Sequence, residues 1–141
     1  MSDAQFYLSV CCWIRKGSKF LIQKRSSNDE RGAGKWLTIG GKVEKGESLC
    51  QALEREILEE SNIIIDMTSI RLLRDYVFEK DGGYKIVVVF TAEWKSGKAL
   101  ALDEGTVVEW VEQKDLKKRE FVFDTVYEEI DLLHNIFRSK L

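Results

Sequence analysis

Residues 41–63 carry a glycine, an arginine and several glutamates at spacings that could bind a metal ion. Gly41 is followed after five residues by Glu47, and seven residues later the chain reads Arg-Glu-Ile-Leu-Glu-Glu over residues 55–60. Carboxylate oxygens are ligands that Mg²⁺ takes in proteins, often together with oxygens of a substrate phosphate. The spacing therefore predicts a loop and then a helix that present carboxylates to a divalent cation.

A helix is predicted from Ser48 to Ser61, and it would carry most of these glutamates. Ser48 and Gln51 fit a capping box, and no Gly or Pro interrupts the segment. At about 100° per residue, one stripe of this helix is apolar. The stripe consists of Leu49, Leu53 and Ile57.

Glu56 and Glu60 fall within or beside that apolar stripe, and Glu59 lies at its flank. Carboxylates next to a packing face lose water and repel one another, so they ionise readily only when a cation binds them. An ordinary solvated acidic surface would lie opposite the stripe, and we therefore favour the metal site. Gly40-Gly41 could form only a turn, or it could let the backbone approach a ligand and offer a carbonyl oxygen to the metal.

The segment resembles the Nudix box of Nudix hydrolases, Gly-x5-Glu-x7-Arg-Glu-aliphatic-x-Glu-Glu-x-Gly-aliphatic. Every specified position matches except the last glycine, which is Asn62 here, and Asn tolerates the left-handed backbone of a helix C-cap. Many members have a proline before the glycine pair, where this chain has Ile39. The resemblance implies an α/β fold, the Nudix-type α/β/α sandwich with a mixed β-sheet, as a single domain over residues 1–141.

The resemblance also implies attack of water on a phosphoanhydride bond, with Mg²⁺ as cofactor and Mn²⁺ as a substitute. The chain is most like MutT-type members, which implies cleavage of a nucleoside triphosphate or modified (d)NTP to nucleoside monophosphate and pyrophosphate. An alternative within the family is another nucleoside diphosphate derivative (ADP-ribose, a nucleotide sugar or a dinucleoside polyphosphate). A proline typical of ADP-ribose-type members is Val77 here. A non-catalytic nucleotide-binding module is the alternative from another class, and the intact glutamates argue against it.

The resemblance assigns roles to individual box residues. Arg55 matches the arginine that holds a box glutamate, but helix geometry directs it away from Glu56. We therefore expect it to pair with Glu47 or with a backbone carbonyl, and we expect Glu47 to act as a positioning carboxylate. The implied metal ligands are Glu56, Glu59, Glu60 and Glu104, with help from the carbonyl of Gly40 or Gly41, and the implied catalytic residues are Arg55, Glu56, Glu59, Glu60 and Glu104.

The general base is expected outside the box. Glu104 before Gly105 resembles the late acidic loop of MutT-type members, in which the glutamate reaches the metal site. Asp103-Glu104-Gly105 could equally be a plain acidic turn. Glu93, at the end of a predicted strand, is an alternative base.

Four residues are expected to bind substrate. Arg25 matches an arginine that contacts phosphate or base in MutT-type members, although Lys-Arg at a strand end is often a solvated pair. Lys42 could contact phosphate. Trp110 could stack on a base, although a tryptophan on a strand is more often part of the core. Asp124, near Phe121, lies where MutT-type members read the base edge, and it is equally explained as a helix N-cap.

The composition fits a small soluble enzyme. The chain has 141 residues, is 44% hydrophobic, and carries a net charge of −2. The chain is not basic overall, so binding to long nucleic acid is not expected. It has no apolar run long enough for a membrane span and no pattern of a signal peptide. Three cysteines make no disulfide framework, which favours the cytoplasm. A small nucleotide is the expected partner, and both monomer and homodimer remain open.

The pattern along the chain predicts alternating strands and helices around a hairpin turn at residues 80–83. Residues 26–35 and 95–105 read as loops. Strands are predicted at residues 6–14, 19–24, 36–39, 63–65, 71–79, 84–94 and 107–111, with helices at 48–61 and 123–138 and a helical turn from Asp115.

Overall fold

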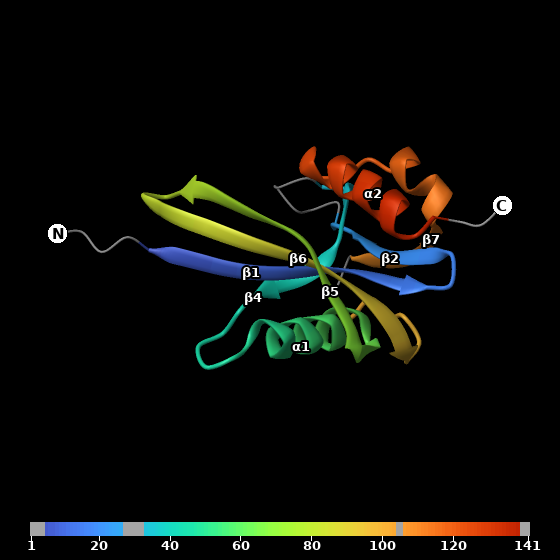
Figure 1. The fold of residues 1–141 in the computed structure, drawn as a ribbon, viewed down its shortest axis with the longest axis horizontal. Coiled ribbons are helices and arrows are strands. Elements are labelled where there is room, and N and C mark those ends of the chain that lie inside the picture. Colours follow the sequence, from blue (N-terminus) through green and yellow to red (C-terminus); the bar gives the residue numbers. More distant parts are fainter. Residues whose placement is uncertain (1–4, 27–32, 104–105, 139–141) are drawn as a thin grey trace.

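A computed structural model describes residues 5–26, 33–103 and 106–138 of the chain. It contains one mixed sheet between two helices, which confirms the predicted α/β sandwich (Figure 1). In chain order the elements are β1 (Phe6–Lys16), β2 (Lys19–Lys24), β3 (Trp36–Leu37), β4 (Ile39–Lys42), α1 (Leu49–Ser61), β5 (Ile64–Lys80), β6 (Gly83–Ser96), β7 (Val107–Glu112), the 3-10 helix η1 (Gln113–Lys118) and α2 (Thr125–Ile136).

Strand β1 organises the sheet because it pairs with three other strands. The strand order is β3-β2-β1-β6-β5, with β4 also paired to β1 and β7 to β2. The β1–β6 pair is parallel, whereas β1 pairs antiparallel with β4 over residues 9–12 and with β2 over residues 14–16. This divided pairing places the glycine pair of β4 against the middle of β1.

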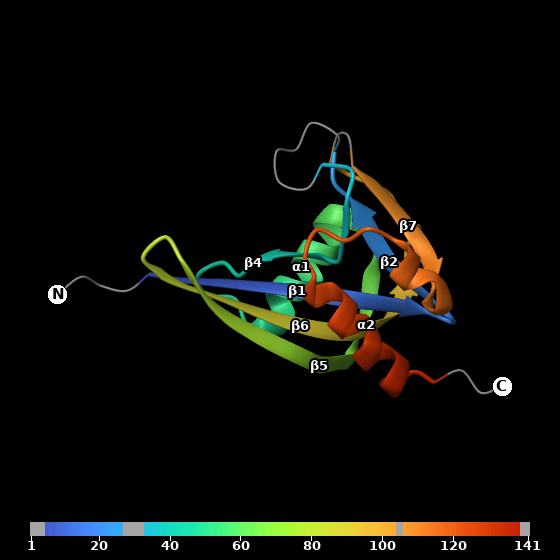
Figure 2. The ribbon, with the colours of Figure 1, turned by 90° about the horizontal axis from the view of Figure 1, so that it is seen from above.

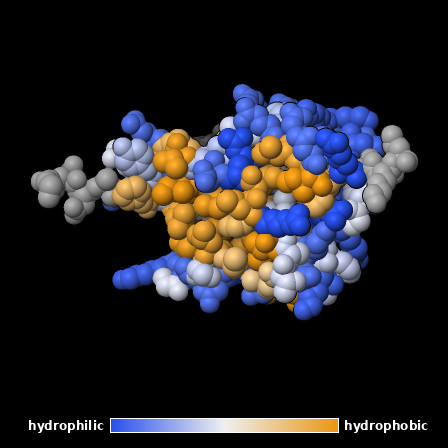
Figure 3. Space-filling view, in the orientation of Figure 1, coloured by the Kyte–Doolittle hydropathy of each residue, from blue (hydrophilic) through white to orange (hydrophobic). Residues whose placement is uncertain are grey.

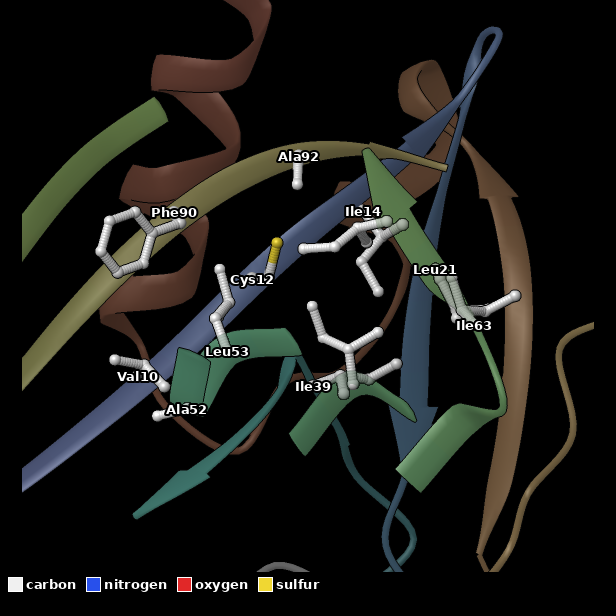
Figure 4. Close-up of a cluster of buried hydrophobic side chains, with 12 residues drawn as sticks. Val10, Cys12, Ile14, Leu21, Ile39, Ala52, Leu53, Ile63, Phe90 and Ala92 are labelled. Carbon is white, nitrogen blue, oxygen red and sulfur yellow. The ribbon is translucent and has the colours of Figure 1, made fainter. Parts of the chain in front are cut away.

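The two helices cover opposite faces of this sheet. Viewed from above, α2 lies in front of the strands and α1 lies behind them (Figure 2). Because side chains alternate along a strand, Val10, Cys12 and Ile14 of β1 pack on the α1 side, while Trp13 packs on the α2 side. Figure 4 shows the α1-side cluster, in which Leu53 of α1 lies among side chains of the sheet.

The long hairpin differs from its sequence-based prediction in one respect. The predicted strands 63–65 and 71–79 form one strand, β5, whose register against β6 shifts at three places. Bulges of this kind insert unpaired residues, so the pattern reads as two short strands although the strand is continuous. The predicted turn is confirmed, with positive φ at Asp81 (50°) and Gly82 (78°).

Helix α2 begins two residues later than predicted, at Thr125. The preceding residues are engaged with the sheet, because Phe121 forms a bridge with Trp36 and the Val122 amide donates to the Trp36 carbonyl at 2.9 Å. These contacts tie residues 121 and 122 to β3, so the helix begins only after the following turn.

The surface over the β5–β6 hairpin is apolar. In Figure 3 hydrophobic residues gather on the left of the view, where β5 and β6 lie in Figure 1. Exposed large apolar side chains of these strands include Leu72, Val77 and Tyr84, and Phe6 of the neighbouring β1 is 65% exposed. Within the described residues, no helix has the length and apolar character needed to cross a membrane.

Candidate active site

The helix that carries the box glutamates has the predicted ends. Ser48 accepts from the Gln51 amide at 3.1 Å, and the Gln51 side chain accepts from the Ser48 amide at 2.8 Å, which completes the capping box. At the other end Asn62 adopts φ 63° in the left-handed region, as its position in the box requires. Its side chain also donates to the Lys98 carbonyl at 3.1 Å.

Glu56 lies directly against Gly41, which has no side chain to displace it. A Cβ at residue 41 would lie 2.5 Å from Oε2 of Glu56, so the carboxylate would have to move away from this position. Gly40 is similarly restricted, since a Cβ there would collide with the Val10 carbonyl oxygen of β1. The glycine pair thus lets a carboxylate of α1 reach the backbone of β4.

Glu60 lies at the free edge of the same strand. The Gly40 amide donates to Oε2 of Glu60 at 3.2 Å, and Nε2 of Gln23 approaches the same oxygen at 3.4 Å. In a β-strand the amide and carbonyl of one residue point to the same side, so the Gly40 carbonyl lies on this edge too. A carboxylate and a carbonyl oxygen therefore share one edge, with Glu56 alongside.

Burial raises the pKa of Glu60 to about 7, and the neighbouring negative charges of Glu56 and Asp103 add to this effect. The hydrogen bonds from Gly40 and Gln23 oppose the rise but do not cancel it. Glu60 is therefore a carboxylate that gains much from a nearby cation.

Arg55 connects the acidic residues around the site. It donates to Glu47 at 2.7 and 2.9 Å and to the Lys42 carbonyl at 3.0 Å, as expected from the helix geometry. Contrary to that expectation, it also pairs with Glu56 at 2.9 Å, and it reaches Glu59 at 3.1 Å. The guanidinium has five donors in a planar fork, so adjacent positions on the helix do not prevent the contact.

Glu47 is tied down by the same arginine. The hydrogen bond from Arg55, followed by one from the Glu44 amide, lowers the pKa of Glu47 to about 2. Glu47 therefore stays ionised and closes the loop between β4 and α1, and its positioning role stays a prediction.

The oxygen donors at this edge fit a magnesium ion. Mg²⁺ keeps several waters and needs only one or two protein carboxylates, and Glu56 and Glu60 supply these beside the Gly40 carbonyl. Glu59 is more remote, because its side chain is 59% exposed and bound to Arg55. In the described ranges no three His, Cys, Asp or Glu side chains are gathered closely enough to hold a metal by themselves.

The two candidates for the general base, Glu104 and Glu93, differ in where they lie. Glu104 lies outside the described residues, while its neighbour Asp103 is close enough to influence the pKa of Glu60. Glu93 forms an ion pair with Arg15, whose guanidinium lies 4.2 Å from the ring of Phe137, the residue that follows α2. That places Glu93 on the face opposite to α1, and the structure argues against it as the base.

Two of the expected substrate residues lie at the ends of strands near this edge. Arg25 follows β2, two residues beyond Gln23, and its main chain is paired with Lys35. Lys42 is exposed directly after the glycine pair. It is aligned with Ser9 of β1, so its side chain lies on the face of β4 opposite to Glu56, with its ammonium 5.9 Å from the centroid of the Tyr7 ring.

The other two are separated by the sheet. Trp110 is half-buried and packs against the α1-side cluster, with the ammonium of Lys16 5.7 Å from its ring centroid. Asp124 is exposed at the start of α2, where its side chain makes no capping hydrogen bond. Trp110 and Asp124 thus belong to different faces, and one base would not be expected to contact both.

Sequence reasoning missed Gln23 and Asp103, which both act on Glu60. Gln23 comes from β2, and its side chain also approaches the Thr38 carbonyl at 3.3 Å. Side chains alternate along β2, and this alternation places Gln23 on the α1 side. The sequence pattern could therefore have indicated its position near α1. Asp103 lies in the segment that the sequence predicts as an acidic turn.

The chain belongs to the Nudix family, because the family model for the NUDIX domain matches residues 6–129. A solved MutT protein from Methanosarcina mazei Go1 shares the fold, with a TM-score of 0.75 and 23% identity over 99% of this chain and 100% of that one. The resemblance to MutT-type members is thereby confirmed for the fold.

Two curated relatives are similar in sequence. The oxidized purine nucleoside triphosphate hydrolase of Danio rerio is 39% identical over 75 residues, which are 52% of this chain and 47% of that protein. The ADP-ribose pyrophosphatase of Methanocaldococcus jannaschii is 31% identical over 108 residues, 77% of this chain and 63% of that protein. The chain spans about half the length of the first curated relatives it matches.

Proposed function

We propose that this chain is a Mg²⁺-dependent, MutT-like Nudix hydrolase in a single domain. It cleaves a nucleoside triphosphate or a modified (d)NTP to the nucleoside monophosphate and pyrophosphate. The observation that carries this proposal is the edge of β4, where Glu56 and Glu60 meet the backbone of Gly40 and Gly41. A carboxylate with a pKa raised to about 7 is costly to keep at neutral pH, and a bound cation explains why it is there.

The chain's own residues have distinct tasks in this proposal. Glu56, Glu60 and the Gly40 carbonyl hold the metal, and Glu59 joins them when its side chain leaves Arg55. When bound, Mg²⁺ neutralises phosphate charge and orients the phosphoanhydride. Arg55 fixes the carboxylates around it through the contacts described above.

The remaining proposed roles concern the attacking water and the substrate. Glu104 is proposed as the general base, with Asp103 beside it as a further acidic neighbour. Arg25 is proposed to contact phosphate because it follows β2 two residues beyond Gln23. Lys42 is proposed as a second phosphate contact at the end of β4, although its side chain lies on the face of β4 opposite to Glu56. Of the two base-binding candidates, Trp110 shares its face with Gln23 and Glu60, whereas Asp124 would bind a base only from the other side of the sheet.

The relatives support two substrate classes, nucleoside triphosphates and nucleoside diphosphate derivatives, to different degrees. An oxidized purine nucleoside triphosphate hydrolase is 39% identical over the matched part, which favours a triphosphate. An ADP-ribose pyrophosphatase matches over 77% of this chain, which keeps a nucleoside diphosphate derivative as the second candidate. A small nucleotide is the proposed partner and the cytoplasm the proposed location. The apolar surface over β5 and β6 makes a homodimer worth testing against a monomer.

The proposal is tested by product release from purified protein. The substrates would be the canonical (d)NTPs, oxidised dGTP, ADP-ribose, nucleotide sugars and diadenosine polyphosphates, each with Mg²⁺ or Mn²⁺ and with chelator. Glu60→Gln should abolish cleavage, whereas Glu54→Gln, an exposed glutamate on the same helix, should leave it unchanged. Nucleotide binding by folded protein without cleavage of any compound would instead support the non-catalytic module.

A further inference from the structure

The sheet face covered by α2 contains a cleft of about 270 Å³ that the proposed reaction does not use. It lies near the C-terminal ends of β1 and β6, beside a bulge in β5 and the end of α2. Its lining includes Arg15, Ser69, Arg71, Thr91, Glu93 and Phe137.

This cleft is separate from the edge that holds the box glutamates. Thr91 is aligned with Trp13 in the β1–β6 ladder, and Trp13 belongs to the α2-side cluster. Arg15 and Glu93 are aligned two residues further along, so their side chains point to the same face. The sheet therefore stands between the cleft and α1.

A β-bulge opens the cleft. Pairing between β5 and β6 is interrupted between Asp66 and Arg71, so the intervening backbone leaves the ladder. The hydroxyl of Ser69 replaces a backbone partner there, because it accepts the Glu93 amide at 2.7 Å and donates to the Asp66 carbonyl at 2.6 Å. The bulge is thus held open by defined bonds, and bulges are frequent beside binding sites.

Two donors in the cleft have no protein partner among the residues that the structure describes. The guanidinium of Arg71 makes no hydrogen bond or ion pair there, and the hydroxyl of Thr91 makes no hydrogen bond, although Thr91 is only 3% exposed. Arg71 and Thr91 are aligned across the β5–β6 ladder, so the two groups face the cleft side by side. An unpaired guanidinium beside a hydroxyl is suited to a carboxylate or phosphate.

The local charge also favours an anion. Arg15 donates two hydrogen bonds to Oε1 of Glu93, at 2.9 and 2.5 Å, and so neutralises that carboxylate, while a third reaches the Gly17 carbonyl at 3.5 Å. Because the charges of Arg15 and Glu93 cancel, Arg71 gives the cleft a net positive charge, although the whole chain carries −2. A phosphate presents oxygens in several directions, which matches donors arriving from two neighbouring strands and from Arg15 better than a planar carboxylate does.

We propose that this cleft is a second anion site, which binds a small phosphate-bearing molecule through Arg71 and Thr91, with Arg15 as the flanking cation. Its volume is at the lower limit for ligand pockets, which suits a phosphate group with little attached. Inorganic phosphate, pyrophosphate and a nucleoside monophosphate share this chemistry.

Calorimetric titration of metal-free, dialysed protein with each of these three anions tests the proposal without engaging the metal-dependent site. Arg71→Gln should weaken the tightest of them by roughly tenfold or more, since a charge-assisted hydrogen bond is removed. Glu60→Gln should bind as the parent does. Arg74→Gln is the matched control, because this arginine lies three residues along the same strand and pairs with Glu128 instead.

A variant that should strengthen anion binding provides a second test. Glu93→Gln should strengthen binding, because it removes the negative charge from the cleft and releases Arg15. The affinities of the three anions, ranked against one another, identify which kind of phosphate-bearing molecule the cleft binds. Equal affinity in the parent and Arg71→Gln, or no saturable binding of any of the three, would overturn the proposal. Hydrolysis by Arg71→Gln should be unchanged, so this result is independent of the proposed enzymatic function.

Discussion

Trp13 of β1 donates its indole N–H to the buried carboxylate of Glu129 in α2 at 2.9 Å. Tyr76 of β5 donates to the other oxygen of Glu129 at 2.7 Å. Glu129 is only 3% exposed, and burial raises its pKa. One carboxylate thus attaches α2 to two strands of the sheet, on the face away from the candidate active site.

Glu129→Ala should destabilise the protein by about 3 kcal/mol, because it leaves the buried N–H of Trp13 without an acceptor and the hydroxyl of Tyr76 with only the Thr125 carbonyl at 3.4 Å. Urea denaturation would measure this loss. Glu128→Ala is the control, since Glu128 has an exposed side chain paired with Arg74 and should cost about 1 kcal/mol or less. Equal losses in the two variants would show that the buried network is not a main source of stability.

Gly41→Ala should lower both stability and activity, because the new Cβ would displace the carboxylate of Glu56. Overpacking of this kind costs about 1–3 kcal/mol. A double-mutant cycle with Glu56→Ala isolates the cause, since removal of the carboxylate should relieve most of the cost. Additive free energies of unfolding in the cycle would contradict the proposed contact.

Glu60 should make the stability of the metal-free protein depend on pH. Its pKa is raised from 4.5 to about 7 in the folded state, so the folded protein binds this proton more tightly than the unfolded chain does. The resulting stabilisation is complete below pH 4.5 and is lost as pH rises to about 7. It amounts to about 3 kcal/mol.

Denaturation of the parent and Glu60→Gln across this pH range is the measurement. The free energy of unfolding of the parent should fall relative to the variant as pH rises. Parallel curves for the two proteins would mean that Glu60 titrates near its ordinary pKa. Saturating Mg²⁺ should remove the fall in the free energy of unfolding of the parent with rising pH, because the ion stabilises the ionised carboxylate.

Arg55→Lys should lower kcat about 10- to 100-fold, as expected when a residue that orients metal ligands is replaced. Lysine keeps the charge but cannot bind Glu47, Glu56 and the Lys42 carbonyl together. The pKa of Glu47 should rise from about 2 at the same time, which NMR titration can follow. Arg119→Lys, in an arginine paired with Glu109, should leave kcat unchanged. A normal kcat in Arg55→Lys would remove the positioning role.

The parts of the site that depend on local sequence could be predicted. The capping box of Ser48, the left-handed Asn62 and the turn at Gly82 are each decided by a few neighbouring residues. The spacing of Glu56 and Glu60 on the helix likewise followed from its periodicity. Local geometry was sufficient for all of these.

The remaining features depend on contacts between distant segments. Gln23 reaches Glu60 only because β2 and β4 both pair with β1, 37 residues separating the two side chains. The face on which Glu93 lies depends on the register between β1 and β6, which no short segment determines. Arg55 binds Glu56 because a long side chain can fold back along the helix, which an angular projection of Cα positions does not represent.

The parallel ladder between β1 and β6 has a consequence for the order of folding during synthesis. The box ends at residue 63, but β1, against which it packs, is flanked on its other side by residues 84–93. A nascent chain that ends at Asn62 has every box carboxylate yet lacks half of the support for β1. We expect such a fragment to remain unfolded, so that the site forms only after the β5–β6 hairpin has left the ribosome.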